Sequence, residues 1–304
     1  MGCRSTVMAV VAAVLVGTVL ALGSAAPAAG APSGSPASGG DGTRRVALGD
    51  SWAAGTAAGE VEAASGTCRR SPRAYPAVVA RAAGETSWTS RACASSTGGG
   101  NGQFTSLGPG TEVVTATVGA DATGLGALAA ACSAKGTPAG CDEAMTRFDR
   151  ALTTLPGALD ASLADIRARA PRAAGTVVGY PLLAEGRACA SGPADATRAA
   201  RLDDAATRLN TILAGRVSAA GLRFVDVRTA FAGHGVCATD PWLAPLTGAD
   251  ALVAGGATAT GHALGVLPAL AAPVATTPAP TSPAPGSDGR REDHSALQAP
   301  LFAG

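Results

Sequence analysis

Ser51 is the residue of this chain that is best placed for nucleophilic chemistry. It follows the apolar run of residues 46–48 and lies between Gly49 and Gly55. A serine directly after a buried strand is exposed at the edge of a sheet, where it can attack a bound carbonyl carbon. The alternative is a turn serine that caps the next helix.

The elements that must position Ser51 are short strands that alternate with longer helices. Four runs that are mostly apolar on both faces, as in a buried parallel sheet, are residues 45–48, 113–118, 176–180 and 222–227. Helical spacing relates Leu155, Leu159, Leu163 and Ile166, and also Leu202, Leu209, Ile212 and Leu213. Gly221 ends the second helix. This order predicts a three-layer α/β/α sandwich with a parallel sheet.

The ends of the chain differ in composition from its centre. Residues 1–28 are typical of a secretory signal peptide, with an apolar run from Val7 to Leu22 and cleavage expected after Ala28. A membrane anchor is the alternative, but this run is shorter than the ~20 residues that a span needs. Residues 29–43 are a flexible lead-in, and residues 273–304 are a Pro-rich tail that we expect to be disordered. One folded domain, residues 44–272, remains, and we expect it to be secreted without a stable membrane span.

Six cysteines remain once Cys3 leaves with the signal peptide. They are Cys68, Cys93, Cys132, Cys141, Cys189 and Cys237. An even number in an exported chain indicates disulfides and not a metal site. The sequential pairing closes the shortest loops, whereas free buried thiols are the alternative.

The net charge of +1, with 15% charged residues, gives no basis for a nucleic-acid partner. We expect a monomer with no cofactor and no metal.

Several segments, taken in order, resemble the extracellular SGNH (GDSL) lipases and esterases of the three-disulfide type. The similar segments are Gly49-Asp50-Ser51-Trp52, Cys68 to Ser71 with Ala74-Tyr75-Pro76, Ala92 to Thr97, Val113 to Leu125, Gly179-Tyr180-Pro181, Thr258 to Gly261 and Leu267 to Leu270. The resemblance covers about residues 44 to 272. It implies the same three-layer fold, hydrolysis of a small-molecule ester or acyl substrate, and the sequential disulfide pairing.

The resemblance also assigns roles to single residues. Ser51 matches the nucleophile. Ser95 falls on a glycine whose N–H belongs to the oxyanion hole, and serine keeps that N–H. Asp121 falls on an asparagine whose amide also donates there, so a carboxylate replaces a donor with negative charge.

The histidine base of that family is missing. Gly256 occupies its position and Val253 that of the supporting acid. Of the three histidines, His262 is the only candidate for a rescue base, although we expect the last helix to turn it away from Ser51. His234 resembles a loop histidine that is not the base, and His294 lies in the tail.

Two hypotheses follow from this mixture of kept and lost residues. The first is a secreted carboxylic ester hydrolase whose activity is doubtful. The second is a non-catalytic pseudoenzyme that binds an acyl or glycan ligand at the cell envelope.

Overall fold

The computed structural model describes residues 44–96 and 102–272 of the protein. The expected signal peptide, lead-in and tail lie outside these residues. Within them, no helix is both long enough and apolar enough to cross a membrane.

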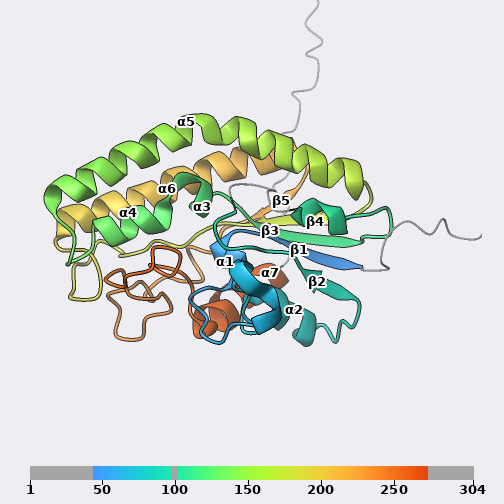
Figure 1. The fold of residues 1–304 in the computed structure, drawn as a ribbon, viewed down its shortest axis with the longest axis horizontal. Coiled ribbons are helices and arrows are strands. Elements are labelled where there is room, and N and C mark those ends of the chain that lie inside the picture. The colour runs from blue at the N-terminus through green and yellow to red at the C-terminus, as the bar shows by residue number, and fades with distance from the viewer. Residues whose placement is uncertain (1–43, 97–101, 273–304) are drawn as a thin grey trace, which may run out of the picture. The chain divides into compact units, whose positions relative to one another are not determined.

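A parallel sheet forms the centre of the described domain (Figure 1). Its strands are β1 (Arg45–Gly49), β2 (Trp88–Ser90), β3 (Val113–Thr117), β4 (Ala174–Val178) and β5 (Arg223–Val225). Their spatial order is β2-β1-β3-β4-β5, with every neighbouring pair parallel. Four strands were predicted from the sequence. The edge strand β2 was not, because it is three residues long and only half-buried.

Helices cover both faces of this sheet. They are α1 (Ser51–Ala54), α2 (Tyr75–Ala82), α3 (Ala120–Thr123), α4 (Leu125–Ala131), α5 (Pro138–Arg169), α6 (Ala196–Ala219) and α7 (Leu267–Ala271), with the short helical segments η1 (Ala63–Cys68), η2 (Gln103–Ser106) and η3 (Gly261–Val266). The long helices α5 and α6 lie on one face, and α2 and α7 lie on the other (Figure 1). The predicted three-layer arrangement is therefore confirmed.

The apolar stripes of the two long helices pack against the sheet, as their spacing predicts. Leu159 and Leu163 on α5 and Leu209 and Leu213 on α6 are each at most 3% exposed. Burying each such side chain stabilises the fold by roughly 1.5–3 kcal/mol. Gly221, which follows α6, has a φ of 66°, a left-handed conformation that favours glycine and ends the helix.

Three disulfides close loops of the domain. They join Cys68 to Cys93, Cys132 to Cys141 and Cys189 to Cys237. This is the sequential pairing expected from the sequence, so that prediction is confirmed. Free thiols at these positions are excluded.

The strand order places the switch point of the sheet between β1 and β3. From β1 the chain moves to β2 on one side and then returns to β3 on the other. In open parallel sheets, ligands bind beyond the carboxyl ends of the strands at such a point. Ser51 follows β1 and Asp121 follows β3, so both lie where this topology forms a crevice.

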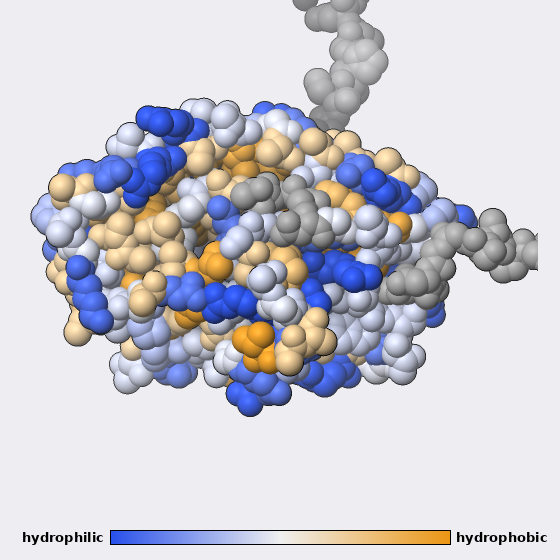
Figure 2. Space-filling model, viewed as in Figure 1, coloured by the Kyte–Doolittle hydropathy of each residue, from blue (hydrophilic) through white to orange (hydrophobic). Residues whose placement is uncertain are grey.

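The surface seen in Figure 2 mixes apolar and hydrophilic side chains over the whole face. Among the described residues, the large hydrophobic side chains that are exposed are Val61, at 44%, and Leu264, at 56%. Isolated exposed side chains of this kind are normal on a protein surface. These two side chains do not indicate a docking surface.

Candidate active site

Ser51 is held at the first turn of α1 by the close approach of two strands. Gly49 has a φ of 135°, and a side chain there would overlap the backbone of Thr117 on β3. Glycine therefore lets the ends of β1 and β3 meet. The next amide, that of Asp50, donates to the Thr117 carbonyl at 2.9 Å. Ser51 follows immediately and is 4% exposed.

Ser51 is bound to Asp121 through two hydrogen bonds. Its hydroxyl donates to Oδ1 of Asp121 at 2.5 Å, and its backbone N–H donates to Oδ2 at 2.9 Å. Asp121 lies in the first turn of α3, directly after the end of β3. The nucleophile position therefore hydrogen-bonds to a carboxylate, whereas the base of a serine hydrolase is a histidine.

Ser95 brings a third part of the predicted site to the same place. Its φ of 63° is left-handed, a conformation that favours the glycine of the related family. The backbone of Ser95 and of Ser96 lies close enough to the Asp121 carboxylate to lower its pKa, against the larger effect of burial. Ser51, Ser95 and Asp121 thus lie close together. The N–H of Ser51 points at the Asp121 side chain.

Asp50 is a second buried carboxyl group at this site, and its role was missed at the sequence level. It is 1% exposed and accepts hydrogen bonds from the hydroxyl of Tyr180 at 2.6 Å and from the N–H of Ala120 at 3.1 Å. Burial and the charge of Asp121 raise the pKa of Asp50, and burial raises the pKa of Asp121. Tyr180 is the last residue of the predicted strand 176–180, and this position was the signal that it reaches the same sheet edge.

The segment that contains Gly256, the position of the missing base, lies against the residues that follow α1. The hydroxyl of Thr56 donates to the carbonyl of Leu252, and the N–H of Gly256 donates to the carbonyl of Val253 at 2.9 Å. Gly256 is buried, and a Cβ placed on it would lie 2.9 Å from the Cβ of Ala57. The site therefore lacks an imidazole at this position and has little room for one.

His262 lies within η3 and does not hydrogen-bond to Ser51. Its side chain is 1% exposed, and neither ring nitrogen has a hydrogen-bond partner in the described part of the chain. The ring packs against Tyr75, with 6.0 Å between the ring centres. Burial lowers the pKa of His262 to about 3. Its use as a rescue base gains no support from this position.

The remaining two histidines do not supply a base within the described residues. His234 stacks on Trp242 with 3.6 Å between ring centres, and its Nδ1 lies 2.8 Å from the carbonyl of Asp240. These contacts fit the loop-packing role expected for it. His294 lies outside the described residues.

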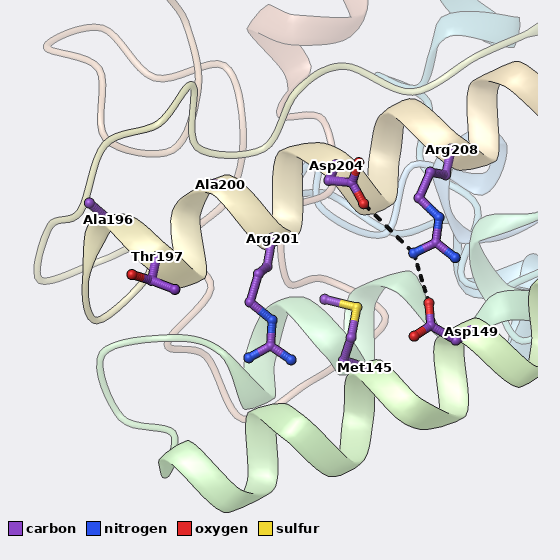
Figure 3. Close-up of a pocket in the computed structure, with 8 residues that line it drawn as sticks. All are labelled: Met145, Asp149, Ala196, Thr197, Ala200, Arg201, Asp204 and Arg208. Carbon is purple, nitrogen blue, oxygen red and sulfur yellow. Dashed lines mark ion pairs between the residues drawn. The ribbon is translucent and has the colours of Figure 1, made fainter.

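A groove of about 660 Å³ lies elsewhere, between α5 and α6 (Figure 3). Its charged side chains are paired, since Arg208 binds Asp149 at 2.8 Å and lies 3.7 Å from Asp204. Paired charges leave no free group to recognise a ligand or to move a proton. This groove therefore offers no chemistry of its own, and the candidate site is the edge of the sheet at Ser51.

Comparison with known proteins identifies a matching family and similar lipases. A family described as the GDSL-like Lipase/Acylhydrolase family matches residues 47–246. A lipase of Streptomyces rimosus is 36% identical over 212 residues, which cover 67% of this chain and 77% of that lipase. Lipase 1 of Streptomyces coelicolor is 34% identical over 227 residues, covering 74% and 84%.

Two solved structures share the fold closely. They are a phospholipase A1 from Streptomyces albidoflavus and an extracellular lipase from Streptomyces rimosus. Each has a TM-score of 0.69 and 33% identity, and each comparison covers 75% of this chain and 97% of the other.

Proposed function

Because the chain belongs to the GDSL-like lipase/acylhydrolase family, we propose that it is a secreted member that binds an ester or acyl ligand at Ser51 without hydrolysing it. One observation carries this proposal: the Ser51 hydroxyl donates to Asp121, while Gly256 stands where the base would be. The site keeps the place for a ligand and lacks the parts for turnover.

Loss of the base removes the proton acceptor that activates serine. Ester hydrolysis begins when a base takes the hydroxyl proton as the oxygen attacks the carbonyl carbon. In another serine hydrolase, deleting the base lowers the rate by about a million-fold. Asp121 accepts a hydrogen bond from the Ser51 hydroxyl, but an aspartate carboxylate is ordinarily a weaker base than imidazole, so it is a poor substitute for the histidine.

Loss of the oxyanion donors adds to this effect. The amide of Ser51 donates to Asp121, so it is not free to stabilise the negative oxygen of a tetrahedral intermediate. Losing one such donor raises the barrier by roughly 2.7–4 kcal/mol. An ionised Asp121 would also repel that oxygen.

Secretion and the ligand class rest on separate observations. Three disulfides are typical of proteins that fold in an oxidising compartment. One similar structure is that of an extracellular lipase, and another is that of a phospholipase A1. An ester or acyl group is therefore the ligand class that these relatives favour.

Hydrolysis of p-nitrophenyl butyrate and p-nitrophenyl palmitate by the purified protein tests the proposal. We expect rates near the uncatalysed background at neutral pH, with Ser51→Ala no slower than wild type. A wild-type rate well above background that Ser51→Ala abolishes would show a working hydrolase. Loss of that rate in His262→Ala as well would identify His262 as its base.

A further inference from the structure

Both oxygens of the Asp121 carboxylate accept hydrogen bonds from Ser51. One oxygen accepts from the hydroxyl and the other from the backbone N–H. The backbone of Ser95 and of Ser96 also lies close enough to the carboxylate to lower its pKa. Neither donor of Ser51 is therefore free for a ligand.

These donors are those that an acyl ligand would use. In an oxyanion hole, backbone amides beside the nucleophile bind the carbonyl or carboxylate oxygen of the acyl group. Asp121 presents two carboxylate oxygens at this place, one to the Ser51 hydroxyl and one to its amide. It thus stands in the position of a bound carboxylic acid product.

We propose that Asp121 is an internal occupant of the acyl site, and that a ligand oxygen enters only when Asp121 is protonated and releases the amide of Ser51. This inference rests on the proposed function, since it assumes that an acyl ligand binds at Ser51. It adds that protonation of Asp121 controls binding and that anionic acyl ligands are excluded while Asp121 is ionised. At neutral pH the site rejects anionic acyl groups.

The groups around Asp121 allow the charge of its carboxyl group to change with pH. Asp50, from the end of β1, is the carboxyl group whose pKa is raised by the charge of Asp121. Tyr180, from the end of β4, donates to Asp50. The loop residues Ser95 and Ser96 are uncharged. Helix α4 has no titratable residue, and the buried side chains of α5 carry none that titrates. No arginine, lysine or histidine of the described chain is bonded to either carboxylate.

Protonation changes what Asp121 offers. Burial raises the pKa of Asp121, so the carboxyl takes up a proton at higher pH than an exposed aspartate does. A protonated carboxyl has one O–H donor and fewer acceptor positions. It therefore competes less for the amide of Ser51, and its O–H is able to donate to the ligand oxygen.

Binding of hexanesulfonate, whose charge is constant between pH 5 and pH 8, tests this inference. Calorimetry or NMR titration of the full mature protein would give Kd at both pH values. We expect wild type to bind about tenfold or more tightly at pH 5, because the competent fraction falls tenfold for each pH unit above the pKa of Asp121. Asp121→Ala should bind equally at both, and as tightly as wild type at pH 5.

Two further variants make the result decisive. Asp121→Asn keeps the size of the side chain and removes its titration, so its Kd should not change with pH even if Asp121→Ala folds poorly. Asp165→Asn, on the exposed surface of α5, removes one negative charge elsewhere and should behave as wild type.

A wild-type Kd that is the same at both pH values, or an Asp121→Ala variant no tighter than wild type at pH 8, would overturn the inference. If no variant bound hexanesulfonate or neutral hexanamide at any pH, the proposed function itself would fail.

Discussion

The hydroxyl of Ser51 lies 2.5 Å from Oδ1 of Asp121, and the amide of the same serine lies 2.9 Å from Oδ2. The two residues are 70 positions apart and meet because β1 and β3 are neighbours at the switch point of the sheet. This paired contact orients the serine toward a carboxylate. It also directs the amide of Ser51 away from any ligand.

His262 should make the fold sensitive to acid. Burial lowers its pKa from 6.5 to about 3. Between these pH values the unfolded chain therefore binds a proton at His262 that the folded chain does not bind. The stabilising effect is complete above pH 6.5 and is lost as the pH falls toward 3. Between pH 7.5 and 4.5, replacing His262 with phenylalanine should reduce the loss of unfolding free energy by ~2.7 kcal/mol.

Urea unfolding at the two pH values measures this difference. His234→Phe is the matched control, because that histidine is only half-buried and stacks on Trp242. An equal acid loss in wild type and His262→Phe would contradict the prediction.

Asp50 should act in the opposite direction, over the pH range between its ordinary pKa of 3.8 and its raised pKa of about 8. Its pKa is raised above the ordinary 3.8 by burial and by Asp121, so the folded state keeps a proton that the unfolded state has lost. Stability is therefore greatest at low pH for this group and falls as the pH rises toward the raised pKa, by up to ~1.4 kcal/mol per pH unit. Asp121, whose pKa is also raised, adds in the same sense.

Asp50→Asn should flatten the change in unfolding free energy between pH 6.5 and 8, where His262 no longer contributes. Denaturant unfolding at these pH values gives the slope. Glu112→Gln, at an exposed carboxylate paired with Arg44, should leave the slope of wild type unchanged. A slope in Asp50→Asn as steep as that of wild type would refute the assignment.

Much of the fold could be predicted from the sequence because burial on both faces leaves a clear pattern. The run of residues 113–118 is mostly apolar, and the leucines of α5 and α6 recur at helical spacing. Strand β2 has neither signal: Trp88, Thr89 and Ser90 are all half-buried at the edge of the sheet. Only its pairing with β1 makes it a strand.

Three residues of the candidate site could be predicted from the sequence, but the hydrogen bonds of the site could not. The resemblance placed Ser51, Ser95 and Asp121 together. It did not predict that the amide of Ser51 would donate to Asp121, since that depends on side-chain rotamers. The hydrogen bond between Asp50 and Tyr180 joins residues 130 positions apart and has no local pattern.

The three disulfides should stabilise the fold unequally. In the chain-entropy model, the stabilisation grows with the length of the closed loop. The bridge from Cys189 to Cys237 spans 48 positions and that from Cys132 to Cys141 spans 9, so their losses should be about 4 and about 2.6 kcal/mol respectively. Denaturant unfolding of each Cys→Ala pair tests this order. A larger loss for the shorter loop would show that packing, and not chain entropy, sets the contribution.

Restoring the two lost groups should restore ester hydrolysis. Gly256→His supplies a base beside Ser51, and Asp121→Asn replaces the occupying carboxylate with an amide that can donate to the oxyanion. Base and oxyanion hole act as one unit, so the double variant should exceed the combined gains of the single changes. Since the new Cβ would lie 2.9 Å from that of Ala57, adding Ala57→Gly should increase the gain further.

The measurement is kcat/KM for p-nitrophenyl butyrate at neutral pH, with Ser51→Ala introduced into the best variant to show that the rate depends on the serine. Gly256→Phe with Asp121→Asn is the matched control, because phenylalanine has similar bulk and no basic nitrogen. If the histidine variant folded but was no faster than this control, the missing base would not be what limits the site. A rate that appears only with histidine and disappears with Ser51→Ala is the result expected of a hydrolase site that lost its base and had its oxyanion hole filled by Asp121.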